Sequence, residues 1–289
     1  MVLCVIGPTA SGKTALSVEL ALIFGGEVVS CDSMQVYRGM DIGTAKPDMC
    51  ERKSVPHHMI DVCDPSEPYS AARYAAEASV CIDDILKRGK LPIISGGTGL
   101  YLSALLNGIH PTASNMDMRG EIESREDLYN ELLCVDPDAA AKLHPNDRRR
   151  IVRALEVFYT SGEPISKHHA DSRKIPQRYE PLIIGIRFDN RAALYERIDR
   201  RVEQMFDRGL PDEVSALMSR VPPPCHTAAQ AIGYKESGDK EAIKLNTRRY
   251  AKRQITWFNK LPDVYWLSSS ENVLNEATRI AKNAGLHKL

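Results

Sequence analysis

The chain has 289 residues, of which 43% are hydrophobic and 26% charged, and 38 Lys and Arg residues balance 38 Asp and Glu. This composition excludes wholesale disorder, and zero net charge excludes a global field that would draw the protein onto nucleic acid. The longest apolar runs hold about five residues where a membrane helix needs roughly 20, and no secretory signal precedes the first motif, so we expect a cytoplasmic protein.

Short apolar runs alternate with helical patterns along most of the chain. Buried strands are predicted at residues 2–6, 27–30, 91–95, 182–186 and 264–267. Helices are predicted at residues 13–24, 70–88, 190–220, 239–259 and 271–284. Strands that alternate with helices indicate an α/β fold, in which a parallel sheet is covered on both faces.

The stretch from about 114 to 180 breaks this alternation, because it contains no convincing strand. Helices are predicted there at 117–133, 138–143 and 147–160, and a loose polar run at 166–178. We therefore expect a core made of residues 1–113 and 181–289, with residues 114–180 as a helical insertion domain.

The strongest motif lies between the first strand and the first helix. It matches G-x-x-x-x-G-K-[ST] and consists of Gly7, Pro8, Thr9, Ala10, Ser11, Gly12, Lys13 and Thr14. Backbone amides at the helix start would bind a diphosphate or nucleotide, Lys13 would add a charge, and Thr14 could hold Mg²⁺.

A second metal-binding element of most phosphate-loop ATPases is missing. The strand that should end in Asp ends instead in Ser-Gly-Gly at 95–97, and residues 58–61 are a weak substitute. The motif therefore predicts a bound phosphate or diphosphate, whereas ATP hydrolysis does not follow and ATP binding stays open.

Two further segments should reach the phosphate loop, because ligands of parallel sheets bind at the carboxyl ends of strands. Asp32 follows the second strand, where its carboxylate could accept a proton from an attacking group, or could only cap a helix or order a loop. Glycines at 96, 97 and 99 permit a close approach, and Thr98 brings a hydroxyl to the same crevice.

Arginines on the predicted helix at 190–209 are spaced to share one face, namely Arg197, Arg200 and Arg201. Guanidinium groups suit phosphate oxygens, although acidic neighbours on the same helix offer ion pairs instead. His57 and His58 have no partners at metal-ligand spacing and are interpreted as structural. The seven cysteines contain no C-x-x-C spacing, which predicts free thiols and no cysteine-based zinc site.

Two short stretches hold basic residues and no acidic ones, 148–153 and 248–260. They indicate a polyanionic partner, although a solvated helix face is an equally good interpretation. In the second stretch one helix face should carry the basic side chains of Arg248, Arg249, Lys252 and Arg253. Another face, with Ala251, Ile255 and Phe258, should pack on the core, and Tyr250 and Trp257 flank the basic face as aromatics suited to unpaired bases.

Together these motifs resemble the tRNA dimethylallyltransferase family, of the bacterial and organellar type, over nearly the whole chain. The resemblance rests on GPTASGKT (7–14), CDSMQVYRGMDIGTAKP (31–47), HHMID (57–61), YSAARY (69–74), GGTGLY (96–101), LHPNDRRRIVRALEVF (143–158), ERIDRRVEQM (196–205), AIGYKE (231–236) and KRQITWF (252–258).

The resemblance implies a P-loop NTPase-like parallel sheet flanked by helices, with a helical insertion domain that contacts tRNA. It also implies transfer of a dimethylallyl group from dimethylallyl diphosphate to the exocyclic N6 amine of adenosine 37, which follows the anticodon of a tRNA. Diphosphate is released, Mg²⁺ is the expected cofactor, and a monomer is expected.

The family's site residues map onto this sequence individually. Asp32 is implied as the general base with Thr98 as a supporting hydroxyl, and Lys13 and Arg197 are implied on the diphosphate. The implied tRNA contacts are Asp32, Ser33, Met34, Gln35, Thr98, Arg119, Arg149, Arg150, Arg153, Gln230, Gly233, Tyr234, Lys235, Lys252, Arg253, Gln254 and Trp257. Gln230 and Asn259 depart from the family, which often has Arg or another basic residue there.

Three alternatives stay open at this point. An adenylate isopentenyltransferase would use the same donor with a free nucleotide, and a phosphate-loop kinase would use ATP with a small acceptor. A non-catalytic RNA-binding module would leave the phosphate loop unexplained. The helical insert and the two basic stretches favour tRNA as the acceptor.

Overall fold

The computed structural model describes residues 1–109, 112, 115–269 and 272–287. The chain divides into a core unit, Met1–Leu106 with Tyr179–Leu289, and a helical unit, Asn107–Arg178. The boundary expected between residues 113 and 114 falls outside the described residues.

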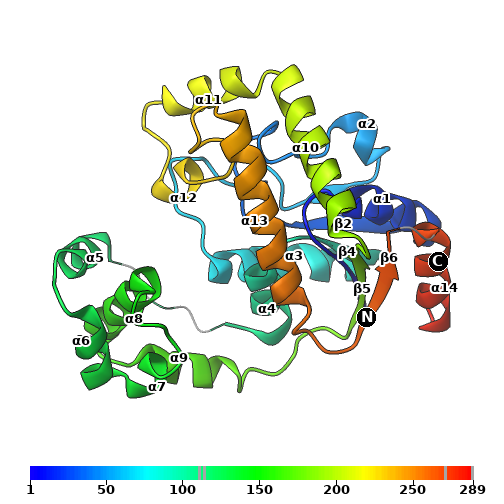
Figure 1. Cartoon of the computed structure of the whole chain (residues 1–289). Coiled ribbons are helices and arrows are strands. Elements are labelled where there is room, and N and C mark those ends of the chain that lie inside the picture. The colour runs from blue at the N-terminus through cyan, green and yellow to red at the C-terminus, as the bar shows by residue number, and fades with distance from the viewer. Residues whose placement is uncertain (110–111, 113–114, 270–271, 288–289) are drawn as a thin grey trace. The chain divides into compact units, whose positions relative to one another are not determined.

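Within the described residues, six strands form one parallel sheet in the core unit (Figure 1). Their order is β3 (His57–His58), β2 (Gly26–Cys31), β4 (Leu91–Gly96), β1 (Val2–Ile6), β5 (Pro181–Arg187) and β6 (Val264–Ser268). The predicted α/β fold with a parallel sheet is confirmed. Because β4 pairs with both β1 and β2, the carboxyl ends of these three strands are adjacent, and this edge receives the phosphate loop and Asp32.

Alternate residues of β1 divide the core of this unit into two layers. Leu3 and Val5 pack with α1 (Lys13–Phe24) and α14 (Val273–Asn283). Cys4 and Ile6 belong to the opposite layer, to which α3 (Ala71–Lys87) and α4 (Gly99–Asn107) contribute. Both faces of the sheet are therefore buried, which is why its central strands are apolar throughout.

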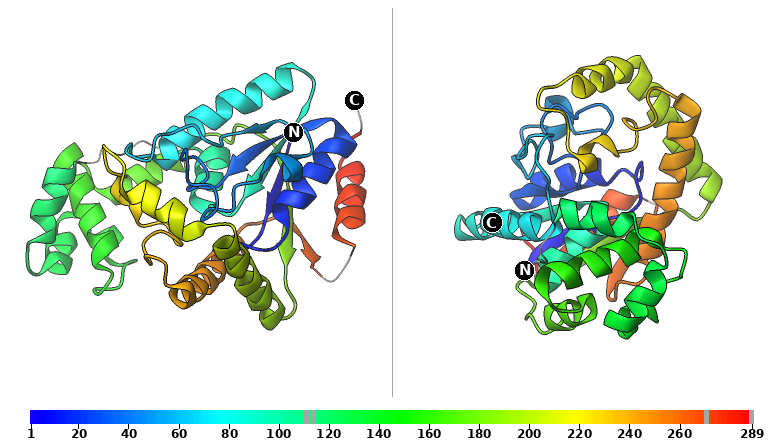
Figure 2. Two further views of the ribbon diagram at one scale, coloured as in Figure 1. Left: turned by 90° about the horizontal axis from the view of Figure 1, so that it is seen from above. Right: turned by 90° about the vertical axis from the view of Figure 1, so that its left-hand side faces the viewer.

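Helices that follow β5 complete the core unit. They are α10 (Arg191–Asp207), α11 (Leu210–Met218), α12 (His226–Ala229) and α13 (Lys240–Phe258), and the short α2 (Met49–Arg52) precedes β3. Figures 1 and 2 show α10 and α13 lying side by side, with Leu194 and Ile198 of α10 packed against Ala251 of α13. Ala251 and Phe258 are buried, so the predicted packing face of α13 is confirmed.

The helical unit contains α5 (Met116–Glu123), α6 (Leu128–Val135), α7 (Pro137–Ala140), α8 (Arg148–Ser161) and α9 (Ile165–Ser172). Leu132, Ile151 and Leu155 lie at the centre of its apolar cluster. The single helix predicted at 117–133 is wrong, because the chain leaves the helical conformation after Glu123 and Asp127 adopts a left-handed one with φ 54°.

The polar run predicted at 166–178 is also wrong over its first half, which forms α9. The amide of Ser166 donates to the buried Asp136 carboxylate at 2.9 Å, and Ile165 packs on the cluster of the helical unit. Tertiary anchoring of the helix start therefore outweighs the weak helical propensity of these residues.

The described part of the chain contains no helix long and apolar enough to cross a membrane. All seven cysteines carry free thiols, and Cys4, Cys31 and Cys63 are buried.

Candidate diphosphate and acceptor site

The phosphate loop takes the backbone conformation that its glycines permit. Gly12 has φ 90°, and at Gly7 a Cβ would lie 2.8 Å from the carbonyl oxygen of Ile186. The hydroxyl of Ser11 is buried, and within the described residues it has no hydrogen-bond partner. Since α1 begins at Lys13, the loop presents the helix N-terminus and an unpaired hydroxyl to an anion.

Three cations meet at this loop. Lys13 Nζ donates to the Pro8 carbonyl at 2.7 Å, and burial together with the charge of Arg201 lowers the pKa of Lys13 to about 7. Arg201 is partly exposed at the surface of α10, and desolvation lowers its pKa too. The Arg197 guanidinium lies 3.6 Å from the place of a Cβ on Gly12. Two guanidinium groups and one amine of lowered pKa therefore border the loop before any anion binds.

Arg201 shares a helix face with Arg197, as their spacing of four predicts, and was a candidate for phosphate oxygens on that ground. The family resemblance, in contrast, implied only Arg197 on the diphosphate. Arg200, between them, pairs instead with Glu196 at 3.0 Å on the exposed side of α10.

Asp32 both orders its loop and keeps a free oxygen. Its Oδ1 accepts from the amides of Met34 and Gln35 at 2.9 and 3.3 Å, while Oδ2 has no hydrogen bond within the described residues. The carboxylate raises the pKa of Lys13 and of Arg201, which puts it within electrostatic reach of both cations. The loop-ordering and proton-accepting interpretations are therefore compatible.

Thr98 joins the segment after β4 to the Asp32 loop. Its amide donates to the Cys31 carbonyl at 3.2 Å, and its Oγ1 accepts from the amide of Ser33 at 3.0 Å. Gly96 permits this approach, because a Cβ there would lie 2.0 Å from the Cys31 carbonyl oxygen.

The Gln254 side chain of α13 connects the phosphate loop to the segment that follows β4. Its Oε1 accepts from the amide of Thr9 at 2.8 Å, and its Nε2 donates to the Gly97 carbonyl at 2.9 Å. The side chain is buried, so we assign it a supporting role in place of the direct tRNA contact expected from the sequence. Tyr250, one turn earlier, interacts with Gln254 and Thr98, and burial raises the pKa of its phenol.

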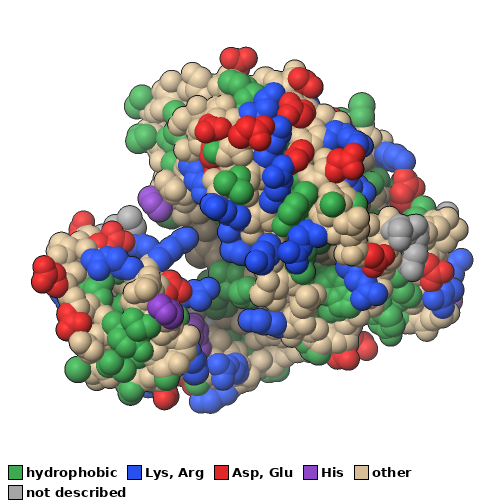
Figure 3. Space-filling view, viewed as in Figure 1, with side chains coloured by type: hydrophobic (Ala, Val, Ile, Leu, Met, Phe, Trp, Pro, Cys, Tyr) green, Lys and Arg blue, Asp and Glu red, His purple; other side chains and the backbone are tan. Residues whose placement is uncertain are grey.

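The opposite side of α13 forms a basic face of exposed side chains, Arg249, Lys252 and Arg253 (Figure 3). Within the described residues these three have no ion pair. Trp257 is 43% exposed beside them, and its ring fills the space next to Gly99, where a Cβ would lie 2.2 Å away. Arg248 was expected on this face, but it turns to α10 and pairs with Asp199.

The other residues of the core unit that were expected to contact tRNA differ in their solvent exposure. Gln230 and Lys235 are exposed, and Ser33 and Met34 are partly exposed. Gly233 and Tyr234 are buried, and the Tyr234 hydroxyl donates to Glu213 at 2.6 Å. A ring buried in this way cannot touch a macromolecule at the surface, so we assign Tyr234 a supporting role as well.

The basic residues expected to contact tRNA from the helical unit are mostly paired. Arg119 pairs with Glu123 at 3.1 Å, Arg150 with Asp147 at 3.3 Å, and Arg153 with the buried Glu156 at 2.9 Å. Arg149 is exposed without an ion pair inside the described part of this unit.

Two family models together match most of the chain. The model described as IPP transferase matches residues 35–261, and the one described as isopentenyl transferase matches residues 1–63. The chain belongs to the IPP transferase family. It is 47% identical over 288 residues to "tRNA dimethylallyltransferase 1" of Pelobacter propionicus, with 93% of each chain covered. It is 44% identical to the "tRNA dimethylallyltransferase" of Acetivibrio thermocellus. That alignment covers 98% of this chain and 95% of the relative.

Solved structures of IPP transferase family members agree with this fold. The full-length tRNA isopentenylpyrophosphate transferase of Bacillus halodurans is 40% identical with a TM-score of 0.71, covering 98% of this chain and 95% of that one. A eukaryotic dimethylallyltransferase acting on tRNA is 34% identical with a TM-score of 0.80, covering 98% of this chain and 77% of that one.

Proposed function

We propose that this chain transfers a dimethylallyl group from dimethylallyl diphosphate to the N6 amine of adenosine 37 in a tRNA. The observation that carries the proposal is the meeting of a phosphate loop, three cations and a carboxylate with one free oxygen at a single sheet edge. The names of the relatives, which are tRNA dimethylallyltransferases, support it. The protein would act as a monomer in the cytoplasm.

The donor's diphosphate fits the positive end of the site. Loop amides and the Ser11 hydroxyl would bind its oxygens, while Lys13, Arg197 and Arg201 would neutralise the charge that develops as the carbon–oxygen bond breaks. The Thr14 hydroxyl is partly exposed, and it makes no hydrogen bond within the described residues, so it could hold a metal ion. Mg²⁺ bound there would supply further positive charge to the leaving diphosphate.

The acceptor fits beside Asp32. As the new carbon–nitrogen bond forms, the N6 amine loses a proton, and the free Oδ2 of Asp32 would accept it. Thr98 fixes the Asp32 loop through Ser33 and so holds the carboxylate in place. The adenosine must leave the stacked anticodon loop to reach this carboxylate, at a cost of a few kcal/mol.

The basic face of α13 would bind the tRNA backbone near that adenosine, with Trp257 available for stacking. We also propose that the helical unit contributes to tRNA binding, with Arg149 as its available cation. The buried Gln254 connects the α13 face to the phosphate loop, so the donor and acceptor sides share one rigid support.

Replacing Arg249 and Arg253 together by Ala should weaken tRNA binding and flatten its salt dependence. Each lost phosphate contact should lower the slope of log affinity against log salt by about one unit or less. Filter binding at several salt concentrations measures this. The matched control changes Arg279 and Lys282 of α14, on the other side of the sheet, to Ala. An unchanged salt slope in the α13 variant would show that its basic face is only solvated surface.

Donor binding should take up protons near pH 8. The pKa of Lys13 is about 7 in the free protein, so the amine is largely neutral there. A bound diphosphate raises that pKa, and up to about one proton is then taken up, so donor affinity should fall as pH rises above 7. Calorimetry in buffers of different ionisation enthalpy measures the uptake. The Lys13→Arg variant stays charged at this pH, so its proton uptake measures the protons exchanged by the donor alone. Equal uptake by both proteins would contradict the assignment of the proton to Lys13.

Substrate choice separates the proposed function from its alternatives. With dimethylallyl diphosphate as donor, an anticodon stem-loop should be prenylated far faster than AMP. Preference for AMP would indicate an adenylate isopentenyltransferase. Consumption of ATP with a small acceptor would indicate a kinase. Chromatography of radiolabelled products distinguishes the three outcomes.

A further inference from the structure

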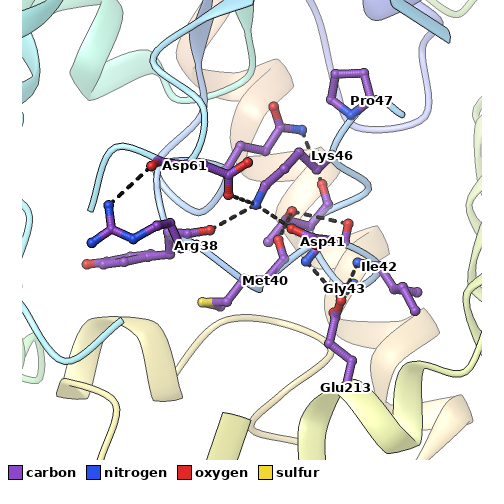
Figure 4. A network of polar contacts seen from close by, with 12 residues as sticks. Arg38, Met40, Asp41, Ile42, Gly43, Lys46, Pro47, Asp61 and Glu213 are labelled. Atoms are coloured by element: carbon purple, nitrogen blue, oxygen red, sulfur yellow. Dashed lines mark hydrogen bonds and ion pairs between the residues drawn. The ribbon is translucent and has the colours of Figure 1, made fainter. Parts of the chain in front are cut away.

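The loop that carries Asp32 is held at its far end by one carboxylate. Glu213, in the first turn of α11, receives four hydrogen bonds. Figure 4 shows its carboxylate directed at the backbone of the loop beside Ile42 and Gly43. Its Oε2 accepts from the amides of Asp41 and Ile42 at 2.9 and 2.8 Å. Its Oε1 accepts from the amide of Gly43 at 2.9 Å and from the Tyr234 hydroxyl at 2.6 Å. Three successive backbone amides of one loop therefore converge on a single side chain from another element.

Packing and charge fix the same segment. A Cβ at Gly43 would lie 2.5 Å from the Tyr234 ring, so the loop backbone lies directly on that ring. The ammonium of the buried Lys46 donates to the Tyr37 carbonyl at 2.9 Å and lies 2.5 Å from both Asp41 and Asp61. Figure 4 shows Lys46 and Glu213 holding the loop from opposite sides of Asp41.

Hydrogen bonds connect the clamped segment to Asp32. Gln35 Nε2 donates to the carbonyls of Thr44 and Ala45 at 3.3 and 3.2 Å, directly after the residues that Glu213 holds. The Gln35 amide donates to Asp32 Oδ1 at 3.3 Å. Gln35 Oε1 in turn accepts from Ser30 Oγ at 3.0 Å. A displacement of residues 41–45 would therefore move the residue that orients the Asp32 carboxylate.

We propose that Glu213 is a positioning residue for the transfer reaction, which acts on the Asp32 carboxylate through residues 41–45 and Gln35. This inference rests on the proposed function, because it assigns Glu213 to the step in which Asp32 accepts the proton. The role requires a carboxylate, since two oxygens without hydrogen atoms can accept all four bonds. A Gln side chain would place an NH₂ group where one of these oxygens lies, and an NH₂ group cannot accept a hydrogen bond from a backbone amide.

The test compares Glu213→Gln with Asp212→Asn, a matched acid-to-amide control at the adjacent exposed residue of α11. Glu213→Gln should lower the single-turnover rate of prenyl transfer by about 10- to 100-fold, with donor affinity within about twofold of wild type. Hydrogen exchange at the amides of 41–43 should become faster by more than about tenfold. The control should match the wild type in all three measurements.

A double-mutant cycle separates positioning from a general loss of structure. If Glu213 acts through Asp32, Glu213→Gln should slow an Asp32→Asn enzyme by less than about twofold, because the group it positions is already lost. A purely structural role would instead reduce the rate by the same factor in both backgrounds and would overturn the proposal. A Glu213→Gln enzyme that retains the wild-type rate would also overturn it.

Two further results keep the test decisive. If Glu213→Gln fails to fold, Tyr234→Phe removes one of the four bonds and should lower the rate by about threefold with the same cycle behaviour. An unchanged rate in that variant would overturn the proposal. If the wild type itself prenylates no tRNA, the proposed function fails. Exchange at 41–43 then still reports whether Glu213 clamps the loop.

Discussion

Asp32→Asn should lower the single-turnover rate of prenyl transfer by about 10²–10⁴-fold, the usual range for a lost general base. The adenine amine is a poor nucleophile, because its lone pair is delocalised into the ring. Its proton becomes acidic only as the new bond forms, so a basic oxygen must already lie in reach. Under the proposed function that oxygen is Oδ2 of Asp32, which has no hydrogen bond within the described residues.

The amide side chain of the Asp32→Asn variant would retain Oδ1 and so the hydrogen bonds from the amides of residues 34 and 35. The loop should therefore keep its shape, and affinities for tRNA and for the prenyl diphosphate should change little. Rapid-quench single-turnover kinetics and separate binding titrations measure the two effects, with Asp212→Asn as the acid-to-amide control. A near-normal rate in the variant would show that Asp32 only orders its loop and that the proton leaves to water.

Lys13→Ala should lower turnover by about 10²–10³-fold, because under the proposed function it removes a charge that would stabilise the departing diphosphate. Loss of this cation should raise the barrier more than it weakens binding, since Arg197, Arg201 and the loop amides remain. Steady-state kinetics with dimethylallyl diphosphate measure the effect. Lys87→Ala, at an exposed position near the end of α3, is the matched control.

The same assay tests the choice of donor. Dimethylallyl diphosphate should bind in preference to ATP. The strand that ends in a metal-binding Asp in most phosphate-loop ATPases is β4 here, and Ser-Gly-Gly at 95–97 stands at its end. Tight ATP binding together with ATP-dependent turnover would contradict this assignment of Lys13 to a diphosphate leaving group.

Much of the fold follows from local patterns. The apolar run at 2–6 and the glycines after it predicted a buried strand and a phosphate loop, because both depend on residues near one another in sequence. Asp32 and Thr98 could be placed beside that loop for a topological reason, since each follows a strand of a parallel sheet. The structure brings them together through Ser33 and Cys31.

The remaining features depend on contacts between distant segments, which local patterns do not report. Helical spacing placed Arg248 with the other basic residues, but Asp199 on a neighbouring helix draws it away. Gln254 and Tyr234 were assigned to tRNA, whereas burial commits them to Thr9 and Glu213, 245 and 21 residues away in sequence. The sequence did not indicate any role for Glu213, because a single Glu on an amphipathic helix is usually solvated.

The most direct test is mass spectrometry of an anticodon stem-loop after incubation with the protein, dimethylallyl diphosphate and Mg²⁺. The account predicts that the adenosine at position 37 gains one dimethylallyl group in place of a hydrogen, with one diphosphate released per group transferred. Omission of the donor or replacement of that adenosine should abolish the gain. An unmodified stem-loop, under conditions where the protein is folded and both substrates bind, would contradict the proposed function.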